Sequence, residues 1–151
     1  YTVLRHSNIY GPHDKYDLKR SHMFGATVTK VMTAQDGTIV VWGEGVEARD
    51  LLYVDDLVDC VERVMERQDQ FFDLYNIGYS EAFPVKEVVR RIITASGKEL
   101  KMVFDRSKPS LKTSLFLNCS RARAGLKWQP TTDFNKGIKK TLGWYRKFYS
   151  V

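Results

Sequence analysis

Apolar residues along the chain alternate between short continuous runs, typical of buried strands, and sets spaced three or four residues apart, typical of amphipathic helices. The short runs are rich in β-branched and aromatic residues and predict strands at 1–5, 38–42, 51–54, 72–77 and 100–104. Because helical segments separate these strands, the pattern predicts an α/β fold. The first strand reads as one of a buried parallel sheet.

Several helix starts are marked by side chains that can accept the free amides of a first turn. Ser21 is expected to cap the first helix, and Asp55 or Asp56 the second. The last helix is expected to begin at Thr132 or Asp133.

Two further helices are predicted in the second half of the chain. Pro84 is expected to open a helix that Gly97 ends, and a short helix is expected over 120–126. The apolar positions predicted to face the core from the four longer helices are Phe24, Val28, Val31 and Met32; Leu57, Cys60, Val61, Val64 and Met65; Val85, Val88, Val89, Ile92 and Ile93; and Phe134, Ile138, Leu142, Tyr145 and Phe148.

The stretch from Trp42 to Asp56 carries the densest set of signals. Two glycines end the strand at Trp42, and Arg49 stands just before the strand 51–54. An arginine between a turn and a rigid strand presents a planar fork of donors that suits a phosphate or a carboxylate. The alternative is a surface Arg49 paired with Glu44, Glu47 or Asp50, and the spacing leaves both interpretations open.

Polar residues follow the first strand immediately, before Gly11-Pro12 ends regular structure. Ser7, Asn8 and Tyr10 are candidates for ligand contact, because α/β sheets bind ligands at the carboxyl ends of parallel strands. The alternative is that these polar residues only follow the end of the strand and form hydrogen bonds within the turn there.

His22 falls in the first turn of the first predicted helix. Free amides there carry partial positive charge and disfavour the imidazolium, so a neutral imidazole could accept or relay a proton near pH 7. The alternative is an ordinary polar surface group.

The chain carries a formal net charge of +6, which suits nucleic acid, a membrane surface or a small anionic ligand. The densest basic cluster lies on the predicted C-terminal helix, where a solvated helix face is the ordinary explanation; it comprises Lys136, Lys139, Lys140, Arg146 and Lys147. No interleaving of aromatic and basic residues marks a single-strand binder, which disfavours nucleic acid. No apolar run approaches the ~20 residues of a membrane span.

The remaining chemical signals are sparse. Cys60 and Cys119 are too few for a disulfide framework, so we expect reduced thiols in a cytoplasmic protein. No motif with metal-ligand spacing occurs, and no metal is predicted. No glycine-rich dinucleotide fingerprint follows a strand, and no Tyr-x-x-x-Lys pair is present, so the chain is not expected to perform hydride chemistry unaided.

Several ordered motifs together are more specific than any one of them: Arg5-x-x-Asn8-x-Tyr10-Gly11-Pro12-His13-Asp14, Ser21-His22, Val40-Val41-Trp42-Gly43-x-Gly45, Arg49-Asp50-x-x-Tyr53-Val54-Asp55-Asp56, Asn76-Ile77-Gly78 and Val103-Phe104-Asp105-x-Ser107-Lys108-Pro109. They resemble the C-terminal, substrate-binding half of the extended short-chain dehydrogenase/reductase family, which comprises NAD(P)-dependent nucleotide-sugar epimerases, dehydratases and reductases. The likeness is strongest to the GDP-L-fucose synthase branch and covers essentially all 151 residues.

This resemblance implies a fold and a set of roles. It implies partial Rossmann-like sheet elements plus a small α/β substrate-binding domain, in one region spanning 1–151. His22 would be the catalytic acid that protonates an enediolate carbon. Contacts to NADP or NAD are implied at Ser7, Asn8, Ile9 and His22. Contacts to the nucleotide-sugar are implied at Asn8, Lys30, Trp42 and Arg49, with Trp42 at the nucleotide and Arg49 on its pyrophosphate.

The chain departs from the fucose synthase pattern in several places. Leu115 stands where that branch has a substrate-contacting lysine, so this contact is lost or moved to Lys112. The helix after His22 lacks the proline that the family tends to place there, and neither cysteine matches the fucose synthase cysteine. The N-terminal half, with the dinucleotide fold and the catalytic Tyr and Lys, is missing.

The resemblance therefore predicts the nucleotide-sugar-binding portion of a family enzyme that is inactive on its own. Its expected partners are a nucleotide-sugar, the missing dinucleotide-binding half and a second copy of the chain, because folding alone would expose apolar surface. One alternative is a non-catalytic module that uses the fold to bind another anion, including nucleic acid. A structural protein with no ligand is the other.

Overall fold

The computed structural model describes residues 1–108 and 113–150, and it confirms the predicted α/β class. The elements in chain order are β1 (Thr2–His6), β2 (Asn8–Tyr10), α1 (Met23–Thr33), β3 (Thr38–Trp42), β4 (Ala48–Tyr53), α2 (Val54–Arg67), β5 (Asp73–Ile77), β6 (Ala82–Pro84), α3 (Val85–Ser96), β7 (Lys101–Asp105), β8 (Ser114–Leu115), α4 (Ser120–Leu126) and α5 (Phe134–Tyr149). Lys112, the expected alternative substrate contact, lies outside the described residues.

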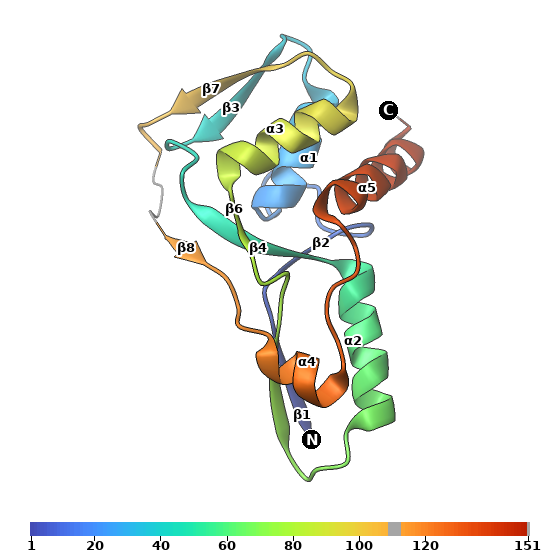
Figure 1. The fold of residues 1–151 in the computed structure, drawn as a ribbon. Helices are drawn as coiled ribbons and strands as arrows, with labels where there is room; N and C mark the ends of the chain where they lie inside the picture. The colour runs from blue at the N-terminus through green and yellow to red at the C-terminus, as the bar shows by residue number, and fades with distance from the viewer. Residues whose placement is uncertain (109–112, 151) are drawn as a thin grey trace.

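Most strand pairs are parallel, as the alternation of strands and helices predicts. β1 pairs with β5, β2 with β4, β3 with β7 and β4 with β8 in parallel, whereas β6 joins β4 antiparallel. Figure 1 shows β1, β5, α2 and α4 grouped near the N-terminus, and β3, β7, α1 and α3 at the opposite end of the molecule. β4 runs between the two groups, so its side chains can contribute to both.

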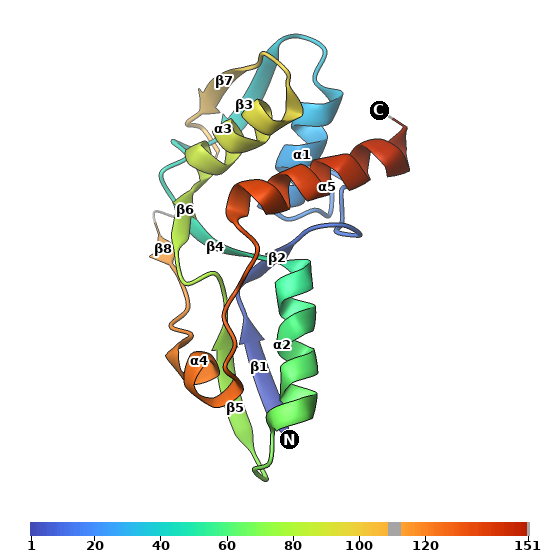
Figure 2. The same cartoon turned by 45° about the vertical axis from the view of Figure 1, so that its right-hand side comes forward.

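The larger core forms where three helices converge. α1 packs on α3, and α3 on α5, and Figure 2 shows the three stacked above β2 and β4. The predicted apolar faces of α1 and α3 point into this core, as does most of the α5 face. Phe148 is an exception, because it lies in the last turn of α5 and is exposed.

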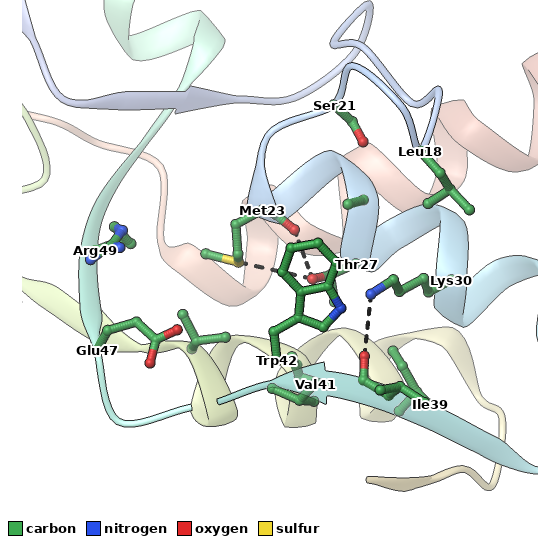
Figure 3. Close-up of a pocket in the computed structure, with 14 residues that line it drawn as sticks. Leu18, Ser21, Met23, Thr27, Lys30, Ile39, Val41, Trp42, Glu47 and Arg49 are labelled. Carbon is green, nitrogen blue, oxygen red and sulfur yellow. Dashed lines mark hydrogen bonds between the residues drawn. The ribbon is translucent and has the colours of Figure 1, made fainter. Parts of the chain in front are cut away.

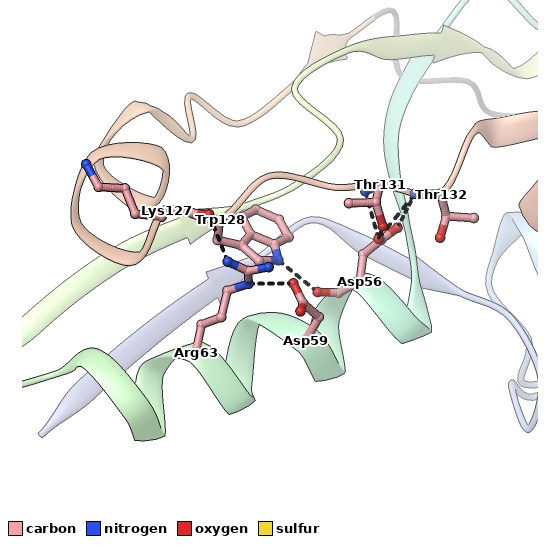
Figure 4. A network of polar contacts seen from close by, with 7 residues as sticks. All are labelled: Asp56, Asp59, Arg63, Lys127, Trp128, Thr131 and Thr132. Atoms are coloured by element: carbon pink, nitrogen blue, oxygen red, sulfur yellow. Dashed lines mark hydrogen bonds and ion pairs between the residues drawn. The ribbon is translucent and has the colours of Figure 1, made fainter.

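A smaller core lies between the β1–β5 pair, α2 and α4. Its buried residues are Leu52, Cys60, Tyr75, Ile77, Cys119, Ala122, Leu126 and Trp128. The indole of Trp128 is fully buried and donates from Nε1 to the backbone oxygen of Asp56 at 3.1 Å (Figure 4). Arg63 links α2 to the segment after α4, because it donates to the Asp59 carboxylate at 2.9 Å and to the Lys127 carbonyl at 3.0 Å.

The predicted role of Asp55 or Asp56 as a helix cap is wrong. α2 begins at Val54, its N-cap is Tyr53, and no side chain caps it. The Asp56 carboxylate instead accepts from the Thr131 amide at 2.9 Å and from the Thr132 amide at 3.2 Å, so it fastens the chain before α5 to α2 (Figure 4). Tertiary amides therefore outcompete the free amides of the helix for this buried carboxylate.

The other two cap predictions have different outcomes. His22, not Ser21, is the N-cap of α1, and its side chain makes no capping bond. Asp133 caps α5 as predicted, accepting from the amides of Asn135 at 3.0 Å and Lys136 at 3.1 Å.

Part of the predicted apolar face of α2 is open to solvent. Cys60 is buried and Leu57 and Val64 pack on the smaller core, but Val61 is exposed and Met65 is 81% exposed. β1 likewise has no buried residue, and β5 is its one partner strand within the described ranges. The prediction of a buried parallel strand is therefore wrong for this chain on its own, because nothing described covers the outer face of β1.

The remaining general predictions concern thiols, metals and membranes. Both cysteines are free and buried, and burial raises the pKa of Cys60 to about 12, so this thiol stays protonated at neutral pH. Among the described residues there is no group of three metal-ligating side chains and no helix long and apolar enough to cross a bilayer.

Candidate functional site

A cavity of about 500 Å³ opens between α1, β3, the start of β4 and α3 (Figure 3). Three of the four residues for which the resemblance implies substrate contact, Lys30, Trp42 and Arg49, line this cavity. They come from α1, β3 and β4, respectively, so the fold gathers residues that are far apart in the sequence.

Trp42 stands at the end of β3 and is 54% exposed. The ammonium groups of Lys30 and Lys108 lie 5.7 and 5.8 Å from the centre of its ring. Lys30 also donates to the carbonyl of Val40 at 3.2 Å, and partial burial lowers its pKa. An exposed aromatic ring beside two cations can hold the flat face of an aromatic ligand and attract its negative charge.

Arg49 is the second residue of β4, so it lies within a strand and not in the turn before one. Its Nη1 donates to the Ala48 carbonyl at 3.1 Å and to Thr113 Oγ1 at 3.4 Å.

The alternative interpretation of Arg49 as one half of a surface ion pair is wrong for the part of the chain described. Arg49 forms no ion pair with Glu44, Glu47 or Asp50 there; Glu44 faces Arg106 at 3.5 Å instead. The remaining donors of the Arg49 guanidinium have no hydrogen-bond partner among residues 1–108 and 113–150, so they could bind an anion in the cavity.

The sequence did not identify two further polar residues on the cavity wall. Glu47 and Ser21 both line the cavity, and each has an oxygen (Oε2 and Oγ) that is shielded from solvent and has no hydrogen-bond partner among residues 1–108 and 113–150. Glu47 lies two positions before Arg49, so along an extended strand both side chains project from the same face. That spacing is the signal that could have identified it.

Apart from Thr27, whose hydroxyl donates to the Met23 carbonyl at 2.7 Å, the remaining wall of the cavity is apolar. Ile39 and Val41 contribute from β3, and Val85 and Val89 from the first turns of α3. These residues were predicted only as strand or core positions, yet they also form a surface that suits a planar ring.

The polar residues at the β1–β2 junction lie apart from the cavity lining. Asn8 donates from Nδ2 to the backbone oxygen of Asp50 at 2.9 Å, and Ile9 packs against the smaller core. Ser7 donates its amide to Ile77 at 2.9 Å, and its Oγ is a buried oxygen without a described partner. Their roles at a cofactor stay predictions.

Two other candidates have different surroundings. Tyr10 is a core residue and not a ligand contact: it is buried against Phe24, Tyr53 and Phe134, with ring centres 4.3, 5.5 and 5.6 Å away, and burial raises its pKa. His22 is exposed and is not part of the lining, although both of its neighbours in sequence are. Its role as an acid stays a prediction.

Asp50 contributes to the site indirectly, through hydrogen bonds that hold its strand in place. Its carboxylate is buried and accepts from the amides of Tyr79 at 2.7 Å, Leu117 at 3.0 Å and Ser80 at 3.3 Å. These bonds tie β4 to two segments distant in sequence and thereby fix the strand that carries Arg49.

Comparison with known proteins identifies relatives of this chain. The model of the NAD dependent epimerase/dehydratase family matches residues 1–78. GDP-L-fucose synthase 1 of Arabidopsis thaliana is 30% identical over 146 residues, which cover 93% of this chain and 44% of that protein. Probable GDP-L-fucose synthase 1 of rice (Oryza sativa subsp. japonica) is 29% identical over 142 residues, or 92% of this chain and 43% of that protein.

Solved structures agree on the fold. The UDP-glucose 4-epimerase of Thermotoga maritima, determined with UDP-glucose, superposes with a TM-score of 0.88 at 25% identity, over 99% of this chain and 47% of that one. The chain thus spans about half the length of the relatives it matches.

Proposed function

Because the chain belongs to the NAD-dependent epimerase/dehydratase family, we propose that it is the nucleotide-sugar-binding portion of a family enzyme of the GDP-L-fucose synthase kind. The observation that carries this proposal is the convergence of Lys30, Trp42 and Arg49 on one cavity. Such an enzyme epimerises and reduces its substrate with NAD(P), and the chain alone is inactive in this proposal.

The proposal also assigns the chain to the C-terminal half of the enzyme. The family match at residues 1–78 establishes membership, and the choice of half is part of the proposal. Two observations support it. No glycine-rich fingerprint follows any strand of the sequence, and the open faces of β1 and α2 offer apolar surface that a second half, or a second copy of the chain, could cover.

Each of the three residues Lys30, Trp42 and Arg49 is chemically suited to one part of a nucleotide-sugar. The Trp42 ring would pack against the nucleotide, and the Arg49 fork would hold the pyrophosphate through two charge-assisted hydrogen bonds. Hydrogen bonds to charged groups contribute roughly 1.5–3 kcal/mol each. Lys30 would add positive charge beside them, and the net charge of +6 favours the approach of a dianion.

The cofactor, NADP or NAD, would have its main site in the other half of the enzyme and supply hydride transfer when bound. On this chain Ser7, Asn8, Ile9 and His22 would border it. The buried Oγ of Ser7, which has no hydrogen-bond partner in the described part of the chain, fits such a role, because a polar group of a neighbouring ligand would satisfy it. His22 would be the proton donor, a role for which its exposed imidazole at the start of α1 is accessible to a ligand.

A second candidate function is binding of another anion, including nucleic acid, without catalysis. The observation in its favour is the set of five basic residues on α5 that are exposed, as the sequence predicts for a solvated helix face: Lys136, Lys139, Lys140, Arg146 and Lys147. Nucleic-acid binding through this face would weaken steeply with salt and would need neither Trp42 nor Arg49.

Calorimetric titration with GDP-, UDP- and dTDP-sugars, with and without NADP(H), tests the proposal. We expect saturable binding of one nucleotide-sugar and a loss of about 10-fold or more in affinity for Arg49→Ala, because a charge-assisted contact is removed. Arg90→Ala is the matched control, since Arg90 is exposed on α3 and pairs with Glu87 away from the cavity lining. Equal affinity of Arg49→Ala and the wild type would contradict the proposal.

A further inference from the structure

We propose that the C-terminal end of α5 docks on the surface of a membrane that contains anionic lipids. The inference goes beyond the proposed function, because it concerns a surface outside the cavity lining. Figure 2 shows α5 lying across the outside of the molecule, with its C-terminal end at the periphery. Two features meet at this end, a helix face with charges of one sign and a set of exposed aromatic rings.

The charged residues of α5 are all basic. At about 100° of rotation per residue, they lie on the side of the helix opposite the residues that it buries in the larger core. Lys140 pairs with Asp55 at 3.1 Å, and Arg146 donates to the Ser96 carbonyl at 2.7 Å. The ammonium groups of the other three have no partner among residues 1–108 and 113–150: Lys136, Lys139 and Lys147. Protein surfaces ordinarily intersperse both signs, so a face of this kind favours an anionic partner.

The last turn of α5 adds exposed aromatic surface. Phe148 is 63% exposed and Tyr149 is 43% exposed. The Phe148 ring stacks on Trp144 with ring centres 4.8 Å apart, and the Tyr149 ring lies 4.5 Å from Tyr145 and 6.1 Å from Tyr16. These contacts hold the two rings in place and still leave much of their apolar surface in water. Solvation explains a basic helix face, but it does not explain aromatic rings exposed beside it.

The segment before α1 extends this surface. The ring of His13 lies 4.8 Å from the ring of Trp144, so the segment packs against the end of α5. His13 and Lys15 are both exposed there, and Lys15 adds a further cation. The one acid of residues 13–16, Asp14, is half-buried and accepts from the Lys15 amide at 2.6 Å. The surface around the aromatic rings is therefore predominantly basic.

Anionic lipid is the partner that matches both features. The negative surface potential of such a bilayer attracts lysine and arginine, and aromatic side chains enter its headgroup region. Nucleic acid matches the charge alone, because base stacking calls for rings spaced along the basic face, and here the rings are gathered at one end. Docking of this kind needs no spanning helix, and none is found in the part of the chain that the structure describes.

The test measures binding of the chain to lipid vesicles by flotation. Vesicles of phosphatidylcholine with about 30% phosphatidylglycerol are compared with vesicles of phosphatidylcholine alone, at low and at raised salt. We expect the chain to float with the anionic vesicles only, and less so at raised salt. Each basic residue near the surface contributes about 5-fold in affinity, so we expect Lys147→Glu to weaken binding by about 10- to 30-fold. We expect Phe148→Ala to weaken it by about 3- to 10-fold.

Matched controls come from the opposite end of the molecule. Phe71→Ala removes a phenylalanine that is 87% exposed, and Arg67→Glu reverses an exposed cation in the last turn of α2, as Lys147→Glu does in α5. We expect both controls to bind vesicles within about 2-fold of the wild type, because the other end does not touch the membrane. Circular dichroism checks that all four variants are folded.

The outcomes decide between docking at this end of α5 and its alternatives. No flotation with anionic vesicles, or equal flotation with neutral ones, would overturn the inference. Equal losses in the controls and in the α5 variants would assign binding to the apolar surface of β1 and α2 and overturn it as well. Tighter binding to an oligonucleotide of about 20 nucleotides, lost in Lys147→Glu, would make nucleic acid the partner and also overturn it. The affinity for nucleotide-sugars tests the proposed function separately, and we expect Phe148→Ala to leave that affinity unchanged.

Discussion

Asp50 shows how a single buried carboxylate can organise a site that it does not line. It accepts three backbone amides, from Tyr79, Ser80 and Leu117, and its own carbonyl accepts from Asn8. These hydrogen bonds hold β4 in place, and Arg49 is positioned as a consequence because it lies on this strand. Gly78 leaves the space that the Asp50 carboxylate occupies, because a Cβ at position 78 would collide with it.

At this scale we predict that Asp50→Asn lowers the free energy of unfolding by about 2–4 kcal/mol, because one acceptor oxygen becomes an amino group facing amide donors. Chemical denaturation measures the change. An exposed carboxylate such as Glu44, changed to Gln, should shift the free energy by less than about 0.5 kcal/mol. An Asp50→Asn variant as stable as that control would show that the three amides have other acceptors.

Site residues whose type itself indicates a chemical role could be predicted from the sequence. Residues whose role depends on what surrounds them in the fold were predicted less well. Lys30 and Trp42 were identified through the family resemblance and Arg49 also through its place between a turn and a strand, and all three line the cavity. Glu47 entered only as a partner for Arg49, because nothing in the sequence says that its carboxylate is left unpaired. Tyr10 was misassigned because position after a strand does not reveal that aromatic rings enclose it.

Among the elements, helices with a partner on their apolar face were predicted well, and α2 was not. The face of α3 packs on α1 and on α5, and the face of α1 packs on α3, so spacing and burial agree. On α2 the same spacing leaves Val61 and Met65 exposed, because no described element covers them. The strands β2, β6 and β8 were missed since they have two or three residues and exist only through pairing with β4.

At the scale of the element, α5 offers a matched pair of glycines. A Cβ at Gly137 would collide with the hydroxyl of Tyr10, whereas a Cβ at Gly143 would meet nothing within 4 Å. We therefore predict that Gly137→Ala lowers the free energy of unfolding by about 1–3 kcal/mol through overpacking.

Gly143→Ala should raise the free energy of unfolding by about 0.5–1 kcal/mol through helix propensity. Thermal and chemical denaturation of the two variants give the sign directly. Stabilisation by both substitutions would mean that Tyr10 moves aside freely and that the contact of α5 with β2 is loose.

At the scale of the whole molecule, the candidate cavity and the uncovered apolar surface lie in different regions of the chain. The cavity lies beside α1, β3 and α3, while the open apolar surface lies on β1 and α2 at the other end (Figure 1). The chain also spans less than half of the GDP-L-fucose synthases it matches, at 43% and 44% of their lengths. If the cavity binds a nucleotide-sugar as proposed, its separation from the uncovered surface would let it bind before that surface is covered.

The measurement that tests this account most directly is hydrogen exchange of the chain with and without a saturating GDP-sugar. We predict slower exchange at the cavity, over α1 and residues 38–50, with α4 and the basic face of α5 unchanged, because a bound ligand suppresses local opening where it makes contact. Slower exchange on the α5 face, or no change in any segment, would contradict the account.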